Sequence, residues 1–128
     1  MTARPGLSGR RSLTVTEADT ASALGSGDVP VLATPRIVAI CEGAACAAVE
    51  GQLEEGTTTV GLAVDVKHLA PTAVGCSVDA EARLEAVDGR RLTFSVKVMM
   101  GDAEVARGRH VRVVVNREQF LERACCAP

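Results

Sequence analysis

The sequence predicts a single α+β domain in which a five-stranded antiparallel sheet wraps around one long central helix. Two features carry this prediction: a nearly all-apolar helical segment in the first half of the chain, and four β-rich segments after it. A chain of 128 residues suits one hydrophobic core rather than two. We expect a flexible N-terminus over residues 1–10, the folded domain over residues 11–124, and a C-terminal tail over residues 125–128.

The central helix is predicted from Thr34 to about residue 51. Thr34 is a favourable N-cap, and Pro35 follows at the first helical position, where its missing N–H costs nothing. Between residues 37 and 49 every side chain is Ile, Val, Ala, Cys or Gly, with the single exception of Glu42. A helix that is apolar on nearly every side is predicted to be buried.

The strands follow from alternating and β-branched segments. A first strand is expected at Arg11–Thr16, and the Thr16–Asp19 segment resembles a capping box that opens a brief helical turn. The four later strands are expected at Thr57–Lys67, Cys76–Val87, Arg91–Met99 and Glu104–Val115, before a short helix at Asn116–Ala124. The Asp88-Gly89 turn makes its flanking strands antiparallel neighbours. This order of elements is the hot-dog fold, whose open sheet edge favours dimers.

Composition argues against several classes of function. The formal charge is −2 and aromatic residues are 2% of the chain, so neither a basic face nor base-stacking platforms for nucleic acid are expected. No apolar stretch reaches the ~18 residues that a bilayer span needs, and no signal-peptide core follows the N-terminus. Five cysteines and two histidines lack metal-ligand spacing. We therefore expect a cytoplasmic protein without a metal, a membrane partner or a nucleic-acid partner.

Glu42 is the most informative residue of the sequence. A carboxylate in a buried apolar helix costs several kcal/mol unless it is paired, protonated or open to a cavity. Its nearest charged neighbours along the helix, Arg36 and Glu50, do not have the spacing that makes contact. Two interpretations stay open: a carboxylate at a dimer seam or exposed stripe, and an acid of a reactive site.

Thr34 and His68 have a structural and a functional interpretation each. Thr34 can simply cap the helix, or the helix start can bind an oxyanion through N–H groups beginning at Arg36 and Ile37, because Pro35 has none. His68 ends a predicted strand, where a histidine is either a surface residue or an acid–base group above the helix.

Together these residues resemble the hot-dog thioesterases of the fluoroacetyl-CoA thioesterase type, over roughly Val31–Arg123. The resemblance rests on Thr34, on Glu42 eight residues later, and on His68, whose spacing agrees with the family without gaps. Further matching segments are Val60-Gly61, Val66-Lys67-His68, Pro71-Thr72-Ala73-Val74-Gly75, Val87-Asp88-Gly89-Arg90-Arg91-Leu92, Gly108-Arg109-His110-Val111-Arg112 and Phe120.

The resemblance implies a catalytic set of Thr34, Glu42 and His68 at a dimer interface, beside Gly61, acting on an acyl thioester of coenzyme A. Such a reaction needs no metal or redox cofactor. Coenzyme A carries phosphates, so the basic residues of the chain are candidate substrate contacts, with solvated surface charge as the alternative for each arginine. These candidates are Arg36, Lys67, Arg90, Arg91, Arg107, Arg109 and Arg112.

The chain departs from this family at the acyl pocket. The fluoroacetate-specific member has aromatic side chains before the threonine, whereas residues 28–32 contain none and the only aromatic residues are Phe94 and Phe120. We therefore do not expect selectivity for a fluorinated acyl group.

Hydrolysis of an acyl-CoA thioester is the preferred hypothesis, with Glu42 as nucleophile or general base and His68 as proton shuttle. A non-catalytic acyl-CoA-binding module and an acyl-CoA dehydratase or isomerase are the alternatives, because one fold hosts several activities. A homodimer is expected, with the pairing of dimers into tetramers left open. His110 and the helix cysteines Cys41 and Cys46 are expected to have structural roles.

Overall fold

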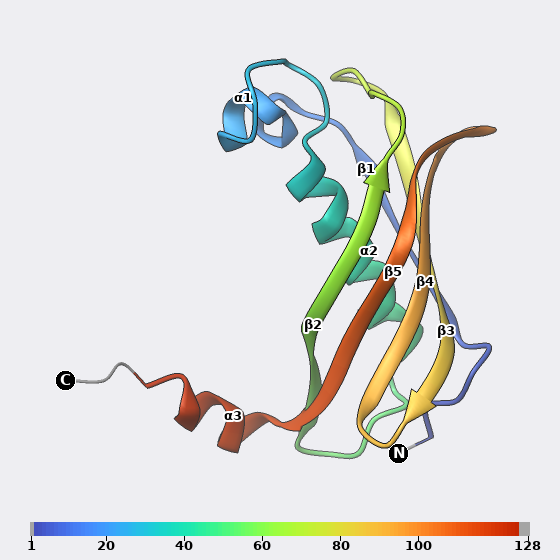
Figure 1. Ribbon diagram of the computed structural model, residues 1–128, viewed down its shortest axis with the longest axis vertical. Helices are drawn as coiled ribbons and strands as arrows, with labels where there is room; N and C mark the ends of the chain where they lie inside the picture. Colours follow the sequence, from blue (N-terminus) through green and yellow to red (C-terminus); the bar gives the residue numbers. More distant parts are fainter. Residues whose placement is uncertain (1, 126–128) are drawn as a thin grey trace.

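The computed structural model describes residues 2–125 and has the predicted architecture of one curled antiparallel sheet packed on a long helix (Figure 1). The strands are β1 (Ser8–Thr14), β2 (Thr57–His68), β3 (Ser77–Asp88), β4 (Arg91–Met100) and β5 (Ala103–Asn116). The helices are a 3-10 turn η1 (Glu17–Asp19), α1 (Ala21–Leu24), the long α2 (Thr34–Ala48) and α3 (Arg117–Arg123). The sheet order is β1-β3-β4-β5-β2, with every neighbouring pair antiparallel.

The first strand begins at Ser8, three residues before the predicted start, and ends at Thr14. At Gly9 this strand crosses α2 so closely that a Cβ would overlap the backbone at Ala44 and Ala48, so the position requires glycine. The capping box at Thr16 and Asp19 is present as predicted. Residues 126–128 of the predicted tail, which include Cys126, lie outside the described residues.

Thr34 is not the N-cap of α2. Ala33 occupies that position without a side-chain hydrogen bond, and Thr34 is the first helical residue. The helix also ends earlier than predicted, at Ala48. The prediction of a cap was wrong because the Thr34 hydroxyl bonds to a distant side chain instead of the helix N–H groups.

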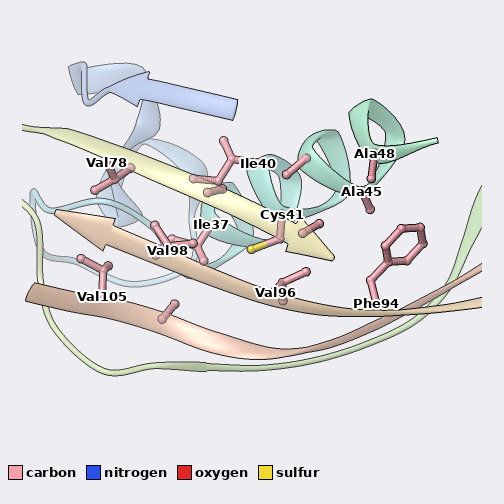
Figure 2. Packing of buried hydrophobic residues seen from close by; sticks show 14 of the residues in the cluster. Ile37, Ile40, Cys41, Ala45, Ala48, Val78, Phe94, Val96, Val98 and Val105 are labelled. Carbon is pink, nitrogen blue, oxygen red and sulfur yellow. The ribbon is translucent and has the colours of Figure 1, made fainter. Parts of the chain in front are cut away.

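The core lies between α2 and the inner face of the sheet. Figure 2 shows the helix residues Ile37, Cys41 and Ala45 directed toward the sheet, with the fully buried Phe94 ring of β4 opposite the last turns of the helix. Small residues on the helix let the sheet approach closely. Burial of the Phe94 side chain stabilises the folded state by roughly 1.5–3 kcal/mol.

The opposite side of α2 is not covered by the sheet, although the nearly all-apolar sequence of this helix favours burial. Ala39 and Cys46 are exposed on that side, so Cys46 does not pack in the core as Cys41 does. The helix packs chiefly on β1 and β3 and only lightly on β2 and β5. Small apolar residues of α2 are therefore left exposed on the side of the helix that faces away from the sheet.

The strand β2 forms one edge of the sheet, and no strand among residues 2–125 pairs with its outer side. Figure 1 shows β2 as the outermost strand on the side from which α3 extends. Its Leu62 and Val64 side chains are 54% and 39% exposed. Unpaired edges that carry apolar side chains are typical sites of strand pairing between chains.

None of the helices in residues 2–125 combines the length and apolar character that a membrane span requires.

Candidate functional site

Thr34 and His68 form a hydrogen-bonded pair between α2 and β2. The Thr34 Oγ1 atom lies 2.8 Å from Nδ1 of His68. The pair forms because the first turn of α2 meets the last residue of β2, where the N–H of Leu69 donates to the carbonyl of Val105 and fixes the end of the strand. Nε2 of His68 is buried and has no hydrogen-bond partner within the described chain. A buried polar atom without a partner is unusual in a folded protein, so this nitrogen is a candidate for a functional role.

Glu42 lies in a second cluster, in the middle of α2. Its Oε2 atom is 3.0 Å from Nη1 of Arg112 and 3.7 Å from Nε2 of His110, both on β5. The Glu42 side chain is 38% exposed, so it is a half-buried carboxylate rather than the fully buried one that the apolar helix predicts. The ion pair with the buried Arg112 offsets the cost of its partial desolvation.

Arg112 is an internal residue and not a surface cation. Its Nε donates to Oγ1 of Thr59 at 2.9 Å, and its Nη2 donates to the Thr59 carbonyl at 3.0 Å. Its Nη1 faces both Glu42 and His110 at 3.0 Å. The guanidinium is therefore occupied within the chain, whereas a contact with a coenzyme A phosphate would need it at the surface.

Gly61 lies on β2 directly opposite Glu42. A Cβ added at Gly61 would be 2.6 Å from Oε2 of Glu42, so only glycine leaves room for the carboxylate in this position. The pairing register of β2 with β5 shifts between Gly61 and Ala63, which is a β-bulge beside the site.

The other candidate substrate contacts lie outside these clusters. Arg36 pairs with Asp19 at 2.9 Å. The Thr16 N–H, followed by Arg36, lowers the pKa of that buried carboxyl. Successive strand residues point to opposite faces, so Lys67 lies on the face opposite His68. There it lines a shallow hollow with Arg107 and Arg109.

The start of α2 does not offer the expected free N–H groups. The N–H groups of Arg36 and Ile37 both donate to the Ala33 carbonyl at 3.1 Å. They bond there because Ala33, not Thr34, is the cap of the helix. The hydroxyl of Thr34 is the polar group that this end of the helix presents.

The pKa values of two buried groups, Cys41 and His110, limit the roles that these side chains can have in a reaction. Burial, and secondarily the charge of Glu42, raises the pKa of the Cys41 thiol to about 11. Cys41 is therefore a thiol at neutral pH and does not serve as a nucleophile. Burial lowers the pKa of His110, so its ring is neutral near pH 7. No cluster of three or more His, Cys, Asp or Glu side chains suited to a metal occurs in residues 2–125.

A single chain separates the three residues that the sequence singles out. Thr34 and Glu42 are eight residues apart on one helix, about 12 Å along its axis. His68 and Gly61 are seven residues apart on β2, about 23 Å along the strand. No hydrogen bond or ion pair within the described range joins Glu42 to Thr34 or His68. The chain thus carries two separate clusters of polar side chains, both between α2 and the edge strand β2.

Sequence reasoning missed the roles of His110, Arg112 and Thr59. A signal was present, because His110 and Arg112 are two residues apart in a strand and therefore face the same side. Polar residues on an inward face require partners, and Glu42 is the acid on the helix that covers that face.

Known proteins of one family are similar to this chain in sequence and in fold. The family model described as fluoroacetyl-CoA-specific thioesterase matches residues 15–118. A fluoroacetyl-CoA thioesterase of Streptantibioticus cattleyicolor is 38% identical over 90 residues, which are 70% of this chain and 65% of that protein. The match thus spans slightly less than two thirds of the relative's length.

Two solved structures share the fold. A variant of the fluoroacetyl-CoA-specific thioesterase FlK, in complex with fluoroacetate and CoA, is 31% identical with a TM-score of 0.86, covering 92% of this chain and 99% of that one. A hot-dog-like protein from Thermanaerovibrio acidaminovorans is 26% identical with a TM-score of 0.85, covering 94% and 89% of the two chains.

Proposed function

The chain belongs to the fluoroacetyl-CoA-specific thioesterase family, and we propose that it hydrolyses an acyl-CoA thioester to a carboxylic acid and free CoA. One observation carries the proposal: the Thr34–His68 pair and the Glu42 carboxylate both lie between α2 and the unpaired edge strand β2. Supporting it, the related FlK structure holds fluoroacetate and CoA.

We propose that two copies complete the site by pairing their β2 edges. An antiparallel pair with its twofold axis near Val64 and Asp65 would place His68 of one copy opposite Gly61 of the other. Glu42 lies against Gly61, so each site would combine Glu42 from one copy with Thr34 and His68 from the other. The same pairing would cover Leu62 and Val64.

In the proposed reaction the thioester carbonyl lies between the two clusters. Glu42 either attacks the carbonyl carbon, giving a mixed anhydride that water then hydrolyses, or removes a proton from a water that attacks directly. The carbon–sulfur bond breaks, and His68 delivers a proton to the departing CoA thiolate. The water consumed in the hydrolysis supplies the proton that restores His68. The Thr34 hydroxyl orients the imidazole through its bond to Nδ1.

Water is the only co-reactant of this hydrolysis, and Glu42 can activate it as a general base, so the proposed mechanism calls for no metal or redox cofactor. Selectivity for a fluorinated acyl group is not expected, because the segment before Thr34 has no aromatic side chain. Arg36 and Lys67 remain proposed contacts of the CoA portion, and a cytoplasmic location remains a prediction.

A free-thiol release assay tests the proposal over short, branched, aromatic and long acyl-CoAs. We expect turnover by the wild type and a loss on the order of 100-fold or more in Glu42→Ala, because general acid–base or nucleophilic catalysis contributes at least that much. Glu50→Ala is the matched control, since Glu50 is an exposed carboxylate just beyond the same helix.

The alternatives predict other outcomes. A binding module would retain acyl-CoA without releasing thiol, in the wild type as in Glu42→Ala. A dehydratase or isomerase would change the acyl chain and leave the thioester intact. Thiol release that Glu42→Ala does not diminish would contradict the proposed role of Glu42.

A further inference from the structure

We propose that His110 is a positioning residue that holds Glu42 in its reactive place by acting through Arg112. The inference rests on the proposed function, in which Glu42 is the reacting carboxylate. His110 itself is completely buried on β5, 3.7 Å from Oε2 of Glu42, so it can influence the reaction only through the groups around it.

Hydrogen bonds determine which ring nitrogen of His110 carries the proton. Nδ1 lies 2.8 Å from the carbonyl oxygen of Ala63, which can only accept, so Nδ1 must be the N–H. In a neutral ring Nε2 is then a lone pair. Nη1 of Arg112 lies 3.0 Å from Nε2 and can only donate, which agrees with this assignment.

The lone pair on Nε2 fixes the direction of the guanidinium. Thr59 holds Nε and Nη2 of Arg112 from β2, and His110 holds Nη1 from the neighbouring position on β5. The same Nη1 donates to Glu42 at 3.0 Å. His110 thus determines the position of Nη1 of Arg112, the donor that binds the Glu42 carboxylate. Gly61 limits the space into which that carboxylate can move.

His110 can orient Arg112 in this way only while its ring is neutral, because the bond requires a lone pair on Nε2. The groups that face the ring are Glu42 from α2, Arg112 from β5, the Ala63 carbonyl from β2 and the stacked ring of Phe94 from β4. A proton on Nε2 would set two donors and two positive charges against each other at 3.0 Å. Burial and the charge of Arg112 oppose that protonation.

Two amide substitutions separate the two functions of the ring. The side-chain amide of Gln extends as far as Nε2 and can accept from Arg112, whereas the shorter Asn reaches only the place of Nδ1 and can donate to Ala63. We expect His110→Gln to keep kcat within about threefold, and His110→Asn to lower kcat about tenfold or more with little change in KM. Thermal unfolding of both variants serves as the control for folding.

Imidazole ¹⁵N NMR tests the geometry independently of activity. The chain has two histidines, so His110→Gln identifies the signals of His110. We expect the Nδ1–H tautomer at pH 7, and an Nε2–H tautomer or a charged ring would overturn the proposal. Equal kcat in both variants, or losses that follow thermal stability alone, would overturn it as well. If the wild type releases no thiol from any acyl-CoA, the proposed function fails, whereas the NMR result still decides whether His110 orients Arg112.

Discussion

The absence of a side chain at Gly61 leaves the space that the Glu42 carboxylate occupies, and a single methyl group would fill that space. The Glu42 oxygen that a Cβ would meet at 2.6 Å is the far end of a flexible side chain, and it can move away without disturbing the backbone. Substitution here should therefore affect the carboxylate much more than the fold.

We expect Gly61→Ala to lower thiol release about tenfold or more, because displacement of Glu42 by even 1 Å misaligns it with the thioester. Its midpoint of thermal unfolding should stay within a few degrees of the wild type. Gly27→Ala is the control, because its added Cβ would make an ordinary 3.5 Å contact with Ala21. Unchanged kinetics in Gly61→Ala would argue against Glu42 as the reacting group.

His110 should also make stability depend on pH. Burial lowers its pKa in the folded chain, whereas in the unfolded chain it titrates near 6.5. Between these two values the unfolded state binds more protons, so this contribution lowers the free energy of unfolding as pH falls below about 7. Urea unfolding at pH 7.5 and 5.5 should show a smaller pH-dependent loss in His110→Gln than in the wild type. An identical loss in both proteins would contradict this linkage.

At the scale of elements, the sequence predicts what local patterns control. The four later strands agree with the structure to within one or two residues at each end, because their β-branched segments and turn signals are local. The start of β1 was not predictable in this way. Ser8-Gly9-Arg10 has little strand propensity, and its pairing with Glu81, Ala82 and Arg83 of β3 makes it a strand.

The site shows the same division between local and distant causes. Thr34 follows the local rule for a cap, yet its hydroxyl bonds to His68, 34 positions away in the chain. Arg112 is 70 positions from the carboxylate that it binds. Residue types and spacing indicated which acid needed a partner, but the partner itself depends on the register of β2 with β5.

At the scale of the whole molecule, residues 2–125 leave the β2 edge unpaired and the buried Nε2 of His68 without a hydrogen-bond partner. The proposed pairing of two β2 edges would bring Glu42 of one copy to His68 of the other. A composite site makes a prediction that a site within one chain does not: two inactive variants should complement each other.

Mixing Glu42→Ala with His68→Ala, after co-refolding or co-expression, should restore activity. Each mixed dimer has one site with Glu42 from one copy and His68 from the other, and a second site that lacks both. Random pairing makes half of the dimers mixed, so thiol release should recover to about a quarter of the wild-type value. Mixing Glu42→Ala with the Glu42→Ala/His68→Ala double variant is the control and should restore nothing. If Glu42 and His68 acted within one chain, every site in the mixture would lack one of them, and the two variants would stay inactive together.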